Sequence, residues 1–163
     1  MSNAFLISLF EHKAWCNRGL VEALRAAPAD VDRRQWAVIL FTFEHTARVD
    51  RIFKGRLIGE DAGIASIVAE RWPDLDELAE TMRETDAWYV DYAARVSPAE
   101  METVVDFTYV ADGEPGRMTK GEMLAHVITH GASHRGQIGE LLGRLGLSGA
   151  SDMMTTFRRP ETN

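Results

Sequence analysis

Several features that would place this protein in a special class are scarce or missing in its sequence. The 163-residue chain has one cysteine, Cys16, so it cannot form a disulfide within itself, and we expect a reducing, cytoplasmic location. No uncharged apolar stretch approaches the 18 or more residues of a membrane-spanning helix. The first residues lack the basic and apolar regions of a secretory signal. We therefore expect a cytoplasmic protein that does not associate with membranes.

Positive charge is also scarce. Lys and Arg number 18 against 25 Asp and Glu, which gives a formal net charge of −7. The acidic residues concentrate in residues 60–114, whereas the rest of the chain is mildly basic. An acidic protein lacks the phosphate-neutralising surface that non-specific nucleic-acid binding requires, so we expect no nucleic-acid partner. The simplest interpretation of the acidic segment is a solvent-exposed helix, and the basic remainder leaves room for a small anionic ligand.

Apolar residues recur every three or four positions over four long segments, the pattern of amphipathic helices. Capping residues place the helix ends: Ser2 and Asp74 at starts, and Gly59 at an end. Thr119 and Glu122 form a capping box at the start of the last helix, with Gly146 just beyond its end. The length fits one domain. We predict an all-α four-helix bundle over residues 1–147, with an irregular tail over residues 148–163, and helices at about 3–26, 33–57, 74–96 and 119–145.

Two connections interrupt the helical pattern. Residues 103–118 combine β-branched and aromatic residues with two turn signals, so we expect a short hairpin between the third and fourth helices. Residues 59–72 are predicted to form a loop, with a short helical turn around residues 64–70.

Three of the five histidines lie in the predicted last helix, at steps of four residues: His126, His130 and His134. Such a step advances about 6 Å along a helix and about 40° around it, so two neighbouring imidazoles can point at one spot. His130 and His134 fall on the apolar stripe of the helix, and His126 is offset from it. Buried imidazoles need partners, which a metal ion, acidic groups or water could supply.

His45 supplies a third imidazole from another helix. It lies within an apolar stripe of the second predicted helix, between Phe41 and Val49. A single histidine in such a stripe is commonly a hydrogen-bonded core residue. Together with His130 and His134 it would instead form a three-histidine metal site with open positions, an arrangement suited to catalysis.

Three segments resemble the DinB-like family, in the family's order. Residues 11–17 resemble its opening Trp-x-Asn helix, and residues 45–53 resemble its His-x4-Asp-x2-aromatic segment. Residues 126–138 resemble its most recognisable signature, which contains His130 and His134. The resemblance covers nearly the whole chain. The last segment is specific, whereas the first two carry little weight alone.

The resemblance implies a four-helix bundle that forms a homodimer and binds Zn or Ni through His45, His130 and His134. It also implies a link to thiol-dependent enzymes, including mycothiol-dependent maleylpyruvate isomerase and bacillithiol transferases. One hypothesis is therefore a metal-dependent transferase that uses a low-molecular-weight thiol on a small electrophilic substrate. The alternatives are a metal-dependent hydrolase that uses metal-bound water and a metal-binding module without catalysis.

Other residues have a functional and a structural interpretation. Asn17 would hydrogen bond either to a ligand imidazole or a bound water, or to backbone. Arg135 would hold either an anionic ligand group or, the interpretation we favour, an acid such as Asp50. His126 would contact the site or pack between helices. The small residues at 132, 136, 139 and 143 predict close approach of a neighbouring helix or a dimer partner.

Overall fold

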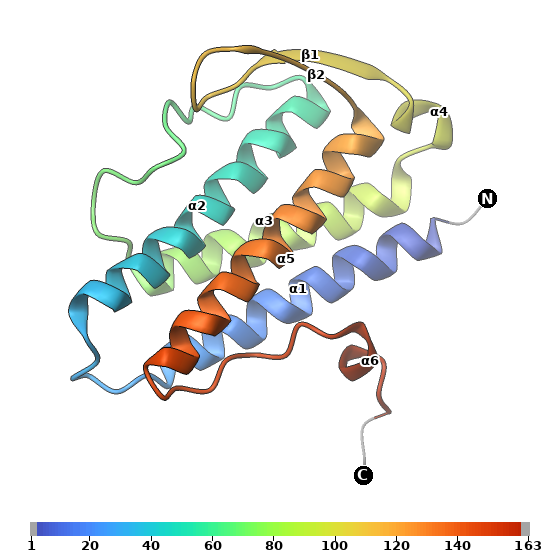
Figure 1. Ribbon diagram of the computed structural model, residues 1–163. Helices are drawn as coiled ribbons and strands as arrows, with labels where there is room; N and C mark the ends of the chain where they lie inside the picture. The colour runs from blue at the N-terminus through green and yellow to red at the C-terminus, as the bar shows by residue number, and fades with distance from the viewer. Residues whose placement is uncertain (1–2, 161–163) are drawn as a thin grey trace.

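The computed structural model describes residues 3–160 and has four long helices (Figure 1). Helix α1 packs along α3, and α2 packs along α5. The apolar faces of these helices form two buried clusters, one toward each end of the bundle. The predicted four-helix bundle is confirmed. The long helices are α1 (Ala4–Arg25), α2 (Arg33–Ile58), α3 (Leu75–Arg95) and α5 (Lys120–Arg144).

The helix ends follow the predicted capping chemistry. Asp74 accepts hydrogen bonds from the backbone of Asp76 and Glu77 at the start of α3. Gly59 ends α2 with a φ of 77°, a left-handed conformation that favours glycine. The Thr119–Glu122 capping box is formed at the start of α5. The predicted cap at Ser2 lies outside the described residues.

Thr119→Ala is expected to lower the free energy of unfolding by about 1 kcal/mol. The substitution removes the hydroxyl oxygen that accepts a 3.1 Å hydrogen bond from the backbone N–H of Glu122. Thr129→Ala is the matched control, because the same change on the exposed face of the same helix removes no cap. Urea denaturation measures both. Equal losses in the two variants would contradict a capping role for Thr119.

A β-hairpin and short helix α4 (Pro98–Met101) connect α3 to α5. Strand β1 (Val104–Thr108) pairs antiparallel with β2 (Pro115–Thr119), and Val105 lies opposite Met118. Both of these side chains pack on the apolar core, so the hairpin covers one end of the bundle (Figure 1). The predicted hairpin is confirmed.

The α2–α3 loop (residues 59–74) contains no helical turn, so the prediction of one at residues 64–70 is wrong. Two carbonyl groups in the middle of the loop accept hydrogen bonds from α2 side chains instead of from the backbone of a helical turn. The Ile67 carbonyl accepts from His45, and the Ser66 carbonyl accepts from Arg48. In the tail, four residues form the short helix α6 (Met154–Phe157), which the sequence analysis did not predict.

The buried face of α2 differs from the predicted stripe. Val38 is 52% exposed, whereas Ile39 and Phe43 are fully buried. The predicted stripe Val38–Phe41–His45–Val49–Ile52 thus misses the core at its start, where Phe43 and Ala47 are buried instead, and is confirmed at its end, where Val49 and Ile52 are buried. His45 lies at the edge of the core and is only partly buried. Among the described residues, no helix is both long and apolar enough to cross a membrane.

Candidate metal centre

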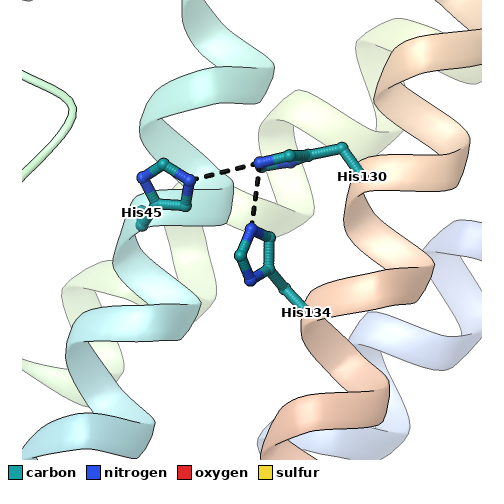
Figure 2. Close-up of side chains that lie close together, drawn as sticks. All are labelled: His45, His130 and His134. Atoms are coloured by element: carbon teal, nitrogen blue, oxygen red, sulfur yellow. Dashed lines mark hydrogen bonds between the residues drawn. The ribbon is translucent and has the colours of Figure 1, made fainter. Parts of the chain in front are cut away.

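Three histidines from two helices converge on one point (Figure 2). His45 comes from α2, and His130 and His134 come from successive turns of α5. The Nε2 atom of His130 lies 3.2 Å from Nε2 of His45 and 3.1 Å from Nε2 of His134. All three side chains are partly buried, and their nitrogens form a group that could hold a metal ion. The pair predicted from the α5 stripe and the third residue predicted from α2 thus come together.

The outer nitrogens of two of these rings fix their protonation. His45 Nδ1 lies 3.0 Å from the carbonyl oxygen of Ile67, and His134 Nδ1 lies 2.9 Å from Oε1 of Gln137. A carbonyl oxygen only accepts, so each Nδ1 must carry the proton. In the neutral ring, Nε2 then has a free lone pair. Both rings therefore present lone pairs to the centre of the cluster.

Hydrogen bonds alone cannot satisfy the two ring nitrogens of His130. Its Nε2 has two Nε2 neighbours but only one hydrogen or one lone pair to offer. Its Nδ1 is buried, and no group in residues 3–160 hydrogen bonds to it. Burial and the neighbouring imidazoles lower the pKa of His130 to about 3, so the ring is neutral at physiological pH. A neutral ring is the form that ligates a metal.

The spacing of the nitrogens fits a tetrahedral metal site. Zn–N bonds of about 2.0–2.1 Å at tetrahedral angles separate two ligand nitrogens by about 3.3 Å. The observed separations of 3.1 and 3.2 Å are close to this value. A cation among three Nε2 lone pairs would also remove the conflict at His130. Three ligands leave a fourth position open.

His126 lies beside the cluster and outside it. Its ring stacks on His130 with centroids 5.2 Å apart and lies 4.6 Å from the Phe53 ring. Burial lowers its pKa, so it too is neutral at physiological pH. These contacts favour the packing interpretation of His126.

A buried group of charges lies at the centre of the bundle. The ammonium nitrogen of Lys13 is 2.6 Å from Oδ2 of Asp50 and 2.5 Å from Oδ1 of Asp86. All three side chains are at least 95% buried. Burial alone would lower the pKa of Lys13, but the two carboxylates raise it. For Asp50, burial is the main cause that raises the pKa to about 6.

Asn17 and Arg135 extend this charged group instead of contacting the histidines. The Asn17 amide donates to Asp86 Oδ2 at 2.8 Å and accepts from Arg135 at 3.0 Å. Arg135 also donates to both carboxylate oxygens of Asp152, each at 3.0 Å. Arg135 therefore forms a salt bridge with an acid, as its structural interpretation predicted. That acid is Asp152, whereas Asp50 pairs with Lys13. The Asn17 bonds are to side chains, which neither interpretation expected.

The buried pairing of Lys13 with Asp50 and Asp86 was not predicted, although the sequence contains a signal for Lys13 and Asp86. Lys13 lies three residues after buried Phe10, and Asp86 lies four residues after buried Met82. Charged residues at these positions of an apolar stripe indicate a buried ion pair. No comparable signal predicts that the Ile67 carbonyl contacts His45, because the position of this carbonyl depends on the path of the loop.

The small residues of α5 do not mark a close helix contact within this chain. A Cβ atom added at Gly136, Gly139 or Gly143 would meet no other atom of the described residues within 4 Å. The prediction of a neighbouring bundle helix at these positions is therefore wrong. The homodimer, which would provide another neighbour, stays a prediction.

A cavity of about 710 Å³ lies between α2, the α2–α3 loop and the start of α3, and none of the three clustered histidines lines it. Glu44 and Arg48, which flank His45, contribute to its wall together with the α2–α3 loop. The Arg48 guanidinium pairs with Oε1 of Glu44 at 3.0 Å. Oε1 of Glu44 is thus paired with a cation, whereas its buried Oε2 has no hydrogen-bond partner among the described residues.

Comparison with known proteins agrees with the family suggested by the sequence. No curated protein sequence and no solved structure matches the chain significantly. The model of the DinB family matches residues 1–162 and so takes in all three histidines of the cluster. This chain belongs to the DinB family.

Proposed function

We propose that His45, His130 and His134 bind one divalent transition-metal ion, Zn or Ni, and that the protein is a metal-dependent enzyme. The observation that supports this most strongly is the convergence of three imidazoles whose Nε2 atoms lie at ligand spacing. Three nitrogen ligands suit Zn, Ni and similar ions. The three-ligand set leaves a position for a further molecule, which a closed structural site would not.

We propose further that the reaction transfers a low-molecular-weight thiol to a small electrophilic molecule. A divalent cation held by three imidazoles lowers the pKa of a thiol and so favours the thiolate, the nucleophilic form. Hydrolysis would benefit from a separate general base. Glu44, the acid next to His45 in sequence, is paired with Arg48. This pairing makes Glu44 a poor candidate for that base, which weakens the case for hydrolysis; a thiol bound to the cation would release its proton to solvent.

The chain's own residues would hold the site rigid during this reaction. The Ile67 carbonyl orients the ring of His45, and Gln137 orients the ring of His134. His130, between them, is held on helix α5, and the ring of His126 stacks against it without taking part in the donor set. The Zn or Ni protein should therefore bind a thiol without a large rearrangement of the helices.

Calorimetric titration of a thiol into the metal-loaded protein tests this function. We would use the Cys16→Ser protein, which lacks the chain's only thiol, loaded with Zn or Ni. The probes are mycothiol, bacillithiol, coenzyme A and glutathione, each beside its S-methylated form. We expect one thiol to bind and its S-methylated form to bind at least tenfold more weakly. Equal binding of both forms, or no thiol binding alongside hydrolysis of an ester substrate, would overturn the transferase proposal.

Gln137→Leu is expected to weaken metal binding by about 10–100-fold, the effect typical of losing a partner that orients a ligand histidine. The substitution removes the acceptor that fixes His134 Nδ1. Gln137→Glu keeps an acceptor oxygen at the same distance along the side chain and should retain most of the affinity. Competition with a chromophoric chelator measures both affinities. Equal losses for Leu and Glu would contradict the orienting role.

A further inference from the structure

A second group of metal-ligating side chains lies where the C-terminal segment crosses helix α1. His12 and Cys16 are one turn apart on α1, and Asp152 comes from the segment between α5 and α6. His12 Nε2 is 3.3 Å from Cys16 Sγ. Each residue offers one donor atom, and the three donor atoms all lie within 4.8 Å of one another. None of these residues belongs to the three-histidine cluster.

We propose that His12, Cys16 and Asp152 form a second metal site, for a thiophilic divalent cation of the zinc type, which fastens the C-terminal segment to α1. Nitrogen, thiolate sulfur and carboxylate oxygen are the three ligand types that Zn²⁺ takes in proteins. Tetrahedral bonds of about 2.3 Å to sulfur and 2.0–2.1 Å to nitrogen put these two atoms about 3.6 Å apart. The observed 3.3 Å is near this distance.

The surroundings of Asp152 orient its carboxylate for a bound ion. A cavity of about 120 Å³ adjoins two of the three donor residues, Cys16 and Asp152, but His12 does not line it. Arg135 donates to both carboxylate oxygens of Asp152 and fixes its plane. A carboxylate has about four lone-pair positions, so these two bonds leave others for a metal.

Binding requires the thiol to lose its proton. Burial is the main cause that raises the pKa of Cys16 to about 12 in the metal-free protein. Burial lowers the pKa of His12, so that ring is already neutral. On binding, the sulfur–hydrogen bond breaks, the sulfur lone pair forms the bond to the cation, and one proton leaves for solvent. The cation supplies the charge that makes the thiolate favourable.

The site would add a direct link between two segments that already meet through aromatic contacts. The His12 ring lies 5.6 Å from the ring of Phe157 in α6, and Trp15 lies 5.6 Å from the same ring. Asp152 is held through Arg135 of α5. A cation bound to His12, Cys16 and Asp152 would join α1 directly to the segment that carries α6 (Figure 1).

Titration with Co²⁺ tests the proposal, because thiolate-to-cobalt charge transfer gives an ultraviolet absorption that imidazole ligands do not give. Cys16 is the chain's only thiol, so this band reports the second site alone, even in the wild type. We would titrate the wild type and the His45→Ala/His130→Ala variant, which removes two ligands of the first cluster. We expect the band in both proteins, saturating at one Co²⁺ per chain in the variant and displaced by Zn²⁺.

Ligand substitutions then show whether all three residues bind the ion. Cys16→Ser should abolish the band, and Asp152→Asn and His12→Phe should each weaken Co²⁺ binding at least tenfold. His12→Phe keeps an aromatic ring against Trp15 and Phe157, and far-ultraviolet circular dichroism checks that each variant is folded. His126→Ala, which alters neither cluster's donor set, is the control. No band in the wild type, or a band unchanged by His12→Phe and Asp152→Asn, would overturn the proposal.

Discussion

Lys13→Met is expected to lower the free energy of unfolding by about 3–5 kcal/mol, the cost typical of breaking a buried ion pair by removing one partner. The substitution keeps a long apolar side chain but leaves Asp50 and Asp86 buried together without their cation. Typical domains are stable by only 5–15 kcal/mol, so the loss is a large share of the total. Urea denaturation of the purified variant measures it.

An exposed ion pair provides the control for Lys13. Arg25→Met breaks the pair of Arg25 with Asp76, whose side chains are 54% and 82% exposed, and should cost less than about 1 kcal/mol. Adding Asp50→Asn to Lys13→Met removes one of the two stranded charges and should restore part of the stability. A Lys13→Met loss as small as that of Arg25→Met would contradict the account of this buried group.

His130→Ala is expected to weaken metal binding by more than 100-fold. His130 is the middle ligand, because its Nε2 contacts those of both other histidines. Losing a partner that merely orients a ligand already costs roughly 10–100-fold, so losing this ligand costs more. Chelator competition with Zn²⁺ measures the affinity in the Cys16→Ser background, which disables the second site proposed above.

The stability of His130→Ala separates metal binding from packing. Without metal, the variant should lie within about 1 kcal/mol of the wild type, because the substitution removes a buried nitrogen that has no hydrogen-bond partner. In the Cys16→Ser background, with free Zn²⁺ at about 100 times the dissociation constant, the protein that keeps His130 gains roughly 2.7 kcal/mol and its His130→Ala variant gains far less. His126→Ala, which removes a stacked ring, should retain the metal-dependent gain. Equal stabilisation by Zn²⁺ of the proteins with and without His130 would contradict the ligand role.

The sequence predicted most of the fold because the controlling signals are local. The capping box at Thr119, the left-handed glycine at position 59 and the apolar period of α3 each depend on residues within a few positions. The errors arose where contacts between distant residues determine the local structure. Two carbonyl groups of the α2–α3 loop accept hydrogen bonds from His45 and Arg48, and no sequence propensity within the loop predicts this.

The candidate site could be predicted in part for the same reason. The His130–His134 pair depends on the helical repeat alone, and His45 could be added because it lies in an apolar stripe. The partners of these rings depend on tertiary structure: Ile67 lies 22 residues from His45 along the chain. The partner of Arg135 was likewise hidden, because Asp152 reaches it only through the path of the C-terminal segment.

Metal content measured by elemental analysis tests the central claim most directly. The proteins are untagged Cys16→Ser and the same protein with His45→Ala, which removes the one ligand that α2 contributes. Both are purified and then reconstituted with Zn or Ni. The three-histidine account predicts one ion per chain in Cys16→Ser and none with His45→Ala. No bound metal in Cys16→Ser after reconstitution with either ion, or one ion per chain in both proteins, would contradict it.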